Sequence, residues 1–379
     1  MSKRKANAEP GKVTKKPVKQ IPKFQCSLCI PSTIISESNA RNLDQATSVA
    51  YQVAKAATLF NVSEIVILSI PEDKIESNKE SVLNAITIPN DQGGKKLVFN
   101  FADDNAAGKI KENTTAEGKS PNNEKTDEKS LILAALLHYF VTPPYLVKSV
   151  FASSKCDKKF KYASKLPKLS SLPFMSNNNV FKDFKEGLTI PKHTPKIKKN
   201  NKKVSPLKKL AVTKYVNIGE PKPMELKEQQ VPVNVRVTVD LKNKKIVSPV
   251  EAYGVIGAKS SFGYHVRICK SFSDIFRESS FPDGYSSSVY VNCNNFFDSN
   301  EKPDETEGLT SFERANITDR ANVLLVLGNP NDYSLSFSRD ASNLEGVQSF
   351  AQMMDSKMLI PEGARIEDGV TISLTKLYS

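Results

Sequence analysis

Apolar and polar positions follow two rhythms along the chain, and each rhythm predicts a different kind of element. In residues 39–60 the apolar side chains from Leu43 to Phe60 recur at spacings near 3.6, which predicts an amphipathic helix. Residues 62–71 follow as an apolar run of strand length, typical of a strand covered on both faces. With the β-rich residues 23–35 in front, this order predicts the opening of a parallel α/β domain.

The same rhythm returns in the last third of the chain. Residues 322–328 are the most apolar run of all and predict a buried strand. Residues 368–379 have helical spacing at Val370, Ile372 and Leu377, which predicts a C-terminal helix. Other runs predict strands at 264–271 and 286–294 and short helices at 272–279 and 309–317.

Two segments interrupt this α/β pattern. Residues 72–128 are polar and mixed in charge, which predicts a long, largely disordered surface insertion. After an apolar helix predicted from residue 130 and ended by Pro143-Pro144, residues 166–262 are rich in Pro and Lys and contain short β-like runs. The clean alternation in 231–254 is the signal of half-buried antiparallel strands. Short strands separated by turns predict a small β-barrel of OB type.

The predicted fold is therefore an α/β domain split by an inserted β module. We expect a basic disordered tail at 1–22 and an N-terminal α/β part at 23–165, with the insertion at about 72–128. The OB-like module follows at 166–262, and the C-terminal α/β part occupies 263–379.

The charge balance points to a polyanionic partner. The chain carries a formal charge of +13 and a pI near 9.3, and nucleic acid is the usual partner of such a surplus. Basic solvated tails alone are the alternative interpretation. Two clusters are the candidate RNA contacts, one in the tail, where Glu9 is the single acid, and one in an acid-free run of the module. They are Lys3, Arg4, Lys5, Lys15 and Lys16, and Lys196, Lys198, Lys199, Lys202 and Lys203.

The sequence favours a soluble, intracellular protein without a metal site. It has no apolar run of the roughly 18 residues that a membrane span needs, and its basic start lacks the apolar core of a secretory signal. Cys26 and Cys29 form a CxxC spacing, but residues three apart in a strand point to opposite faces. No second CxxC or suitably spaced histidine pair completes four zinc ligands. No catalytic residue can be named.

Several stretches resemble one family. Residues 30–71, "HYFVTPPYLVKSVF", residues 263–285, "VLLVLGNP" and "EDGVTISLTKL" resemble, in this order, the SPOUT-superfamily (α/β-knot) RNA methyltransferases. The subfamily is the archaeal and eukaryotic one with an inserted OB-like domain. The resemblance implies a trefoil-knotted α/β domain that binds S-adenosylmethionine in the knot, dimerises through it and methylates RNA. By position, the cofactor residues would be Leu327, Gly328, Asn329, Ile360, Pro361, Gly363, Gly369 and Ile372.

The chain departs from the family pattern where the cofactor is expected. Relatives have a glycine-rich run after the last strand, whereas this chain has "GNPNDYSLSF". Their second loop is rich in small residues, whereas here it contains Leu359 and Ile360. Arg365 matches one family arginine, and Ala46 stands where relatives tend to carry a basic residue. Bulky side chains in such a loop would narrow or fill the pocket.

Two hypotheses follow. The first is a SPOUT-fold RNA-binding protein with a degenerate cofactor pocket that acts in ribosome assembly on precursor ribosomal RNA. The alternative is an active S-adenosylmethionine-dependent RNA methyltransferase. The protein is expected in the nucleus, and within it in the nucleolus, alongside ribosome-assembly proteins. Its partner across the knot would be an identical chain or a paralogue. No membrane is expected to be involved.

Overall fold

The computed structural model describes most of the chain, and the predicted tail at 1–22 lies outside that part. The described residues are 24–70, 83–89, 95–101, 127–151, 159–175, 182–191, 197–199, 202–204, 211–257, 262–294, 306 and 308–379.

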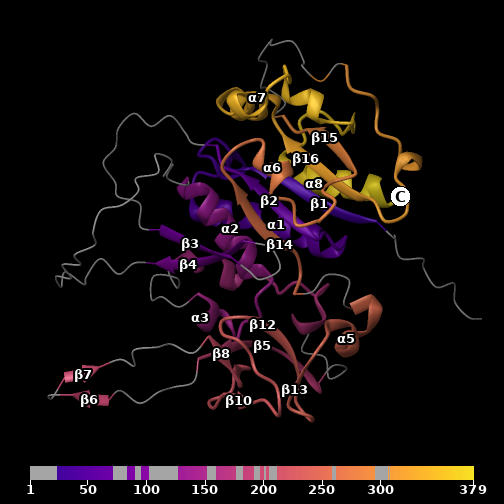
Figure 1. Cartoon of the computed structure of the whole chain (residues 1–379). Helices are drawn as coiled ribbons and strands as arrows, with labels where there is room; N and C mark the ends of the chain where they lie inside the picture. The colour runs from indigo at the N-terminus through magenta and orange to yellow at the C-terminus, as the bar shows by residue number, and fades with distance from the viewer. Residues whose placement is uncertain are drawn as a thin grey trace, which may run out of the picture.

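A six-stranded, fully parallel sheet forms the centre of the larger unit (Figure 1). Its middle strands are continuous apolar runs, as a strand covered on both faces requires. From edge to edge the strands are β14 (His265–Cys269), β2 (Glu64–Leu68), β1 (Gln25–Pro31), β16 (Asn322–Gly328), β15 (Ser287–Asn292) and β17 (Ser356–Lys357). The predicted strands of the α/β domain are confirmed, whereas β17 was not predicted.

Helices cover both faces of this sheet. One face packs against α1 (Leu43–Leu59), α2 (Glu128–Phe140) and α8 (Ile366–Tyr378). The other packs against α6 (Asp274–Arg277) and α7 (Pro330–Arg339). Short 3-10 helices are η1 (Ser32–Ile35), η2 (Ala163–Lys165), η3 (Pro173–Met175), η5 (Arg314–Asn316), η6 (Ala341–Asn343) and η7 (Phe350–Met353).

The two cysteines of the CxxC spacing lie on opposite faces of this sheet. Cys26 packs in the cluster under α1, α2 and α8, and Cys29 packs in the cluster under α6 and α7. Their thiols therefore diverge, as the strand period of two predicts. Burial raises the pKa of both thiols, that of Cys29 to about 12, so both remain protonated at neutral pH.

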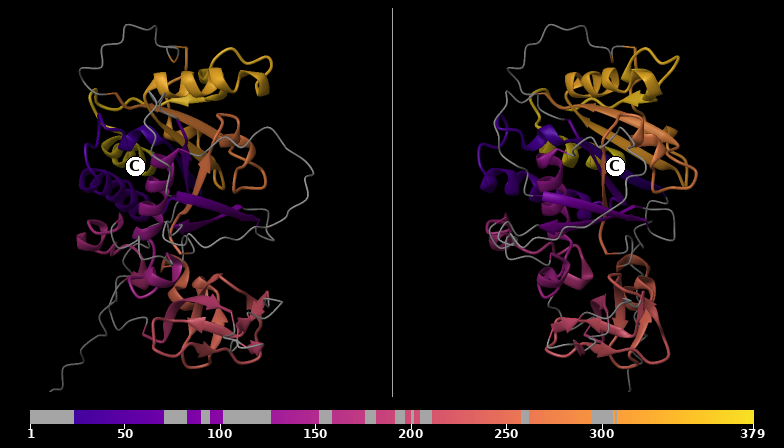
Figure 2. Two further views of the ribbon diagram at one scale, coloured as in Figure 1. Left: turned by 90° about the vertical axis from the view of Figure 1, so that its left-hand side faces the viewer. Right: turned by 60° about the vertical axis from the view of Figure 1, so that its left-hand side comes forward.

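A second, smaller unit contains a five-stranded antiparallel sheet and lies below the parallel sheet in both views of Figure 2. Its strands in order are β10 (Met224–Glu225), β9 (Tyr215–Asn217), β5 (Phe184–Ile190), β12 (Arg236–Asp240) and β13 (Lys245–Val247). The pair β8 (Val212–Thr213) and β11 (Val231–Pro232) and helix α5 (Pro249–Gly257) complete it. The predicted antiparallel strands are present, and α5 replaces the end of the predicted strand region 231–254.

Partly buried polar contacts join the two units. The Tyr145 hydroxyl donates to the Glu186 carbonyl at 3.0 Å, and Asn217 Nδ2 donates to Ser149 Oγ at 2.6 Å. The Arg236 guanidinium lies 4.7 Å from the centre of the Phe174 ring, in the segment that leads from the α/β unit into the β unit. The β unit is thus tied to the segments that follow α2 at several points.

Other local predictions need correction. The helix predicted at 309–317 is wrong, because only Arg314–Asn316 forms a 3-10 turn and Ser311 bridges Lys357. Helix α7 was missed, because "NPNDYSLSF" was interpreted as a loop. Within the insertion predicted at about 72–128, β3 (Leu83–Pro89) and β4 (Lys95–Phe101) form an antiparallel pair; the rest of 72–126 lies outside the described residues. Helix α3 (Val147–Val150) is also present.

Candidate functional site

The first predicted cofactor loop is a tight connection from strand to helix. Gly328 ends β16, Asn329 is the N-cap of α7, and Pro330 occupies its first turn. Asn329 Oδ1 accepts a hydrogen bond from the Asn331 amide at 2.9 Å, which is the usual work of an N-cap asparagine. Proline fits the first helical position because a backbone N–H at that position would have no intrahelical acceptor. The polar run after Gly328 therefore builds a helix.

Two buried tyrosines donate hydrogen bonds to the carbonyls at the end of β16. The Tyr333 hydroxyl donates to the Leu327 carbonyl at 2.8 Å, and the Tyr290 hydroxyl donates to the Gly328 carbonyl at 2.8 Å. Both rings are fully buried, and burial raises the pKa of Tyr333 well above its usual value. The hydroxyl therefore stays a donor at neutral pH, and the two carbonyls are satisfied within the fold.

Gly328 has no free space beside it. A Cβ at this position would lie 2.9 Å from the Tyr333 ring and 3.1 Å from Pro31 Cγ. The glycine is therefore required by the close approach of α7 and β1, which is a packing reason and needs no ligand.

The second predicted loop reaches the same strand end from the other side. A Cβ on Gly369 would lie 2.6 Å from Cys293 Sγ, 3.3 Å from Ile360 Cδ1 and 3.7 Å from Leu327 Cδ2. Protein atoms thus fill the space between α8, the loop and β16. The expectation that Leu359 narrows the pocket is wrong, because its side chain is 64% exposed. Ile360 packs inward as expected.

An open hollow of about 490 Å³ lies on the outer side of this loop. It is lined by Pro361, Glu362, Gly363, Ala364, Asp368, Thr371 and Ile372. Three predicted cofactor residues, Pro361, Gly363 and Ile372, therefore line one hollow, which the loop and the first turns of α8 form alone. Leu327, Ile360 and Gly369 pack against one another instead, and Gly328 and Asn329 lie at the start of α7.

The residues present do not fit a nucleoside held between the two loops. Backbone carbonyls that could receive an adenine or ribose are bonded to tyrosines, and Ile360 lies over Gly369. A buried crevice between loops is the usual form of a small-molecule site. Here that crevice is packed with side chains.

A chain of hydrogen bonds that the sequence did not indicate links the surrounding elements. Thr33 Oγ1 donates to Asp332 Oδ2 at 2.5 Å, and Asn39 Nδ2 donates to the Thr33 carbonyl at 3.2 Å. Arg365 Nη2 donates to the Asn39 carbonyl at 2.9 Å, and its Nε lies 3.0 Å from Glu367 Oε1. The family-matched arginine therefore ties the start of α8 to the β1–α1 connection. Spacing in sequence gives no signal for contacts between residues this far apart.

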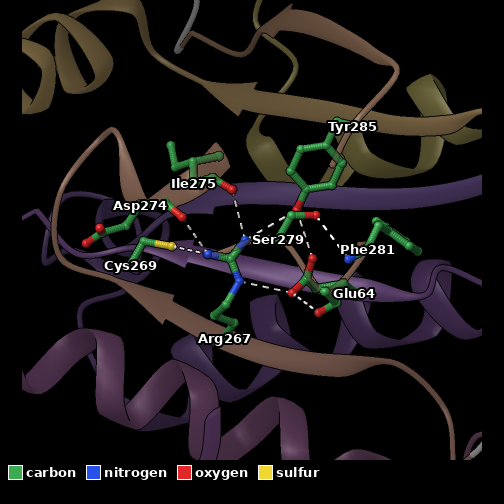
Figure 3. A network of polar contacts seen from close by, with 9 residues as sticks. Glu64, Arg267, Cys269, Asp274, Ile275, Ser279, Phe281 and Tyr285 are labelled. Atoms are coloured by element: carbon green, nitrogen blue, oxygen red, sulfur yellow. Dashed lines mark hydrogen bonds and ion pairs between the residues drawn. The ribbon is translucent and has the colours of Figure 1, made fainter. Parts of the chain in front are cut away.

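The most extensive buried polar network lies elsewhere, at the β2–β14 edge (Figure 3). Glu64, 1% exposed, accepts hydrogen bonds from Arg267 Nε at 3.0 Å, Ser280 Oγ at 2.5 Å and the Tyr285 hydroxyl at 2.8 Å. Arg267 also donates to the carbonyls of Asp274 and Ile275. Every charge faces a partner, so the network holds the loop after β14 against the sheet.

The predicted RNA contacts lie only partly within the described residues. Lys3, Arg4, Lys5, Lys15, Lys16 and Lys196 lie outside them. Strands β6 (Ile197–Lys199) and β7 (Lys202–Val204) form an antiparallel pair in which Lys198 is opposite Lys203 and Lys199 is opposite Lys202. Figure 1 shows this pair well away from the five-stranded sheet. Four of the predicted lysines are thus brought together on one hairpin.

The described residues contain neither a candidate metal cluster nor a helix able to span a membrane. Within 24–70, 127–151 and the other described ranges, no group of three His, Cys, Asp or Glu side chains is arranged so that it could bind a metal ion. Among the helices in those ranges, none has the length and apolar character that crossing a membrane demands.

Comparison with known proteins gives the family. A family model described as "Putative RNA methyltransferase" matches residues 25–377. Two Saccharomyces cerevisiae proteins named "Putative methyltransferase" are 34% and 30% identical, covering 97% and 92% of this chain and 96% and 86% of their own lengths. A Drosophila melanogaster "28S rRNA (uridine-N(3))-methyltransferase" is 25% identical over 69% of this chain and 45% of its own. The chain belongs to the family described as "Putative RNA methyltransferase", within the SPOUT methyltransferases.

Proposed function

We propose that this protein is an RNA-binding member of the SPOUT family whose cofactor pocket has degenerated and which acts in ribosome assembly. The observation that carries the proposal is the packing at the end of β16. The hydroxyls of Tyr333 and Tyr290 donate hydrogen bonds to the Leu327 and Gly328 carbonyls, respectively. Ile360 fills the space beside Gly369. A protein that keeps the fold but closes the pocket would use the fold as a binding platform.

The RNA in this proposal is precursor ribosomal RNA. Its support is the net charge of +13, the β6–β7 lysines, and relatives named as 28S rRNA methyltransferases. The salt-dependent release of counterions from phosphate would supply most of the affinity. The proposal places the protein in the nucleus and nucleolus, among ribosome-assembly proteins.

The proposal also includes a trefoil knot, an inserted OB-like barrel and a dimer formed through the knot. The path of the chain supports the knot: after β17 at one edge of the sheet, the chain returns to α8, which packs in the same cluster as α1 and meets the end of β16 at Gly369. The partner would be an identical chain or a paralogue that has kept an open pocket.

The second candidate is an active S-adenosylmethionine-dependent RNA methyltransferase. The hollow of about 490 Å³ favours it, because Pro361, Gly363 and Ile372 line a space of nucleoside size. In that case the cofactor would lie on the outer side of the second loop.

Calorimetric titration of S-adenosylmethionine into the full chain separates the two candidates. The first predicts no saturable heat for the wild type. Ile360→Ala, which removes the side chain over Gly369, would be the variant most able to regain weak binding. The second predicts saturable binding that Ala364→Trp abolishes, because Ala364 lines the hollow and its replacement fills it. Saturable wild-type binding that Ala364→Trp removes would refute the degenerate pocket.

RNA binding is measured separately, with the same samples. Fluorescence anisotropy with a labelled ribosomal RNA fragment should show binding whose affinity falls steeply with salt. If the wild type binds no RNA at low salt, the RNA-binding part of the proposal fails, whatever the calorimetry shows.

A further inference from the structure

A short segment between the two units presents a tyrosine flanked by two lysines. The Nζ atoms of Lys161 and Lys165 each lie 5.7 Å from the centre of the Tyr162 ring. Both lysines are exposed and Tyr162 is half-buried. Ammonium groups at this distance from a ring are attracted by its negative face, so the three side chains form one cationic and aromatic surface.

Buried residues anchor the backbone on both sides of Tyr162. Phe160, 4% exposed, stacks on the Tyr139 ring of α2 with the ring centres 4.7 Å apart. Ala163, on the other side of Tyr162, is also buried in the core under α1 and α2. The two anchors hold the backbone on either side of Tyr162, so its ring is positioned before any ligand arrives, which lowers the cost of ordering on binding.

The positive charge of the segment is not neutralised within the described part of the chain. Among those residues, no carboxylate lies within ion-pair distance of Lys161, Lys165 or the nearby exposed Lys168. Lysines held near one ring repel each other, and an anion placed between them relieves this repulsion. A ligand for this surface would therefore be anionic.

Single-stranded RNA fits this combination better than other polyanions. Proteins bind single strands by stacking bases on aromatic rings and placing Lys or Arg along the phosphates. A purely basic patch would serve duplex RNA or an acidic protein equally well, but the half-buried Tyr162 ring adds a stacking contact that only an unpaired base can use.

We propose that Lys161, Tyr162 and Lys165 form a contact site for single-stranded RNA, in which one base stacks on Tyr162 and the adjacent phosphates lie at the two lysines. The site rests on the proposed RNA-binding function and extends it to the class of RNA. It lies at the start of the segment that reaches Phe174 and the half-buried Arg236 of β12. A strand held here would run along the junction between the two units.

The test uses the full chain and a labelled oligouridylate of about 12 nucleotides, a length within the range of single-strand sites. Tyr162→Ala should weaken binding about tenfold through the lost stacking, with the salt dependence unchanged. Tyr162→Phe keeps the ring and should bind as the wild type does. Lys161→Gln with Lys165→Gln should lower the slope of log affinity against log salt by about 1.4, since each single-strand phosphate contact contributes about 0.7.

Lys270→Gln with Arg339→Gln is the matched control, because both residues are exposed and the change in net charge is the same. It should leave the slope close to that of the wild type. If the wild type binds RNA and Tyr162→Ala binds equally well, the site is refuted while the RNA-binding function stands. A duplex or polyglutamate that binds as tightly as the single strand, unaffected by Tyr162→Ala, refutes it too. Absence of any wild-type RNA binding refutes both.

Discussion

Removing Arg267 should destabilise the protein more than removing any exposed charge, because Arg267 neutralises the buried Glu64 carboxylate. Glu64 is 1% exposed, so in Arg267→Met its carboxylate would stay buried without a positive partner. It would keep only two of its three hydrogen-bond donors, Ser280 and Tyr285. The carbonyls of Asp274 and Ile275 also lose their donor. Breaking one side of a buried pair costs about 3–5 kcal/mol. This is a large fraction of a typical stability of about 5–15 kcal/mol.

Urea unfolding followed by far-ultraviolet circular dichroism measures the loss, since the chain has no tryptophan for fluorescence. With a slope of about 2 kcal/mol per molar urea, the midpoint should fall by about 2 M. Arg267→Met combined with Glu64→Leu should recover part of the loss, because no unpaired charge then remains. The control is Lys242→Met, which removes an exposed ion pair to Asp183. If Arg267→Met shifts the midpoint no more than this control, the assigned role of the network is wrong.

Three further predictions concern other parts of the fold. Burial acts to raise the pKa of Asp340, but hydrogen bonds, chiefly from Ser273, outweigh it and hold the pKa below its usual value. This stability is present above the unfolded pKa and is lost as pH falls through the folded one. Asp340→Asn should therefore lower the thermal midpoint at pH 7, and this effect should fade progressively as pH falls below the usual value of 3.8; an equal effect at pH 7 and well below pH 3.8 would contradict this. Gly369→Ala should cost about 1–3 kcal/mol by overpacking against Cys293, and Cys293→Ala should rescue it in a double-mutant cycle of thermal unfolding; simple additivity would count against the contact. Because burial raises the pKa of Cys29 to about 12, its thiol should react with a disulfide reagent at pH 8 only after denaturation, and rapid labelling of Cys29 in the native protein, located by peptide mass spectrometry, would disprove it.

Continuous apolar runs of strand length, alternating with amphipathic helices, were sufficient to predict the parallel sheet. The run from Val323 to Leu327 is 0% exposed and lies between β1 and β15, because a strand without polar side chains is stable only when both faces are covered. The same strand period placed Cys26 and Cys29 on opposite faces. The C-terminal helix followed from its spacing and begins two residues before the predicted start.

The sequence predicted less well where a local pattern allows two structures. The sequence "GNP" is compatible with both a ligand-binding loop and the start of a helix. In the structure Asn329 is the N-cap of α7, and α7 is held in place where the Tyr333 hydroxyl donates to the Leu327 carbonyl. Helix α7 is poor in apolar residues, and the helical spacing of its buried Tyr333 and Phe337 was not recognised. Bulk alone predicted that both Leu359 and Ile360 would fill the pocket, but only Ile360 packs inward.

What the sequence alone determined is the order of the elements, the apolar strands of the sheet and the surplus of positive charge. Only the tertiary structure decided that tyrosine hydroxyls close the end of β16, that Glu64 meets Arg267, and that Tyr162 stands between two lysines. The reason is physical: burial and periodicity are properties of a few neighbouring residues. A hydrogen bond or a filled crevice depends on where distant segments meet, and that is set by the packing of the whole chain.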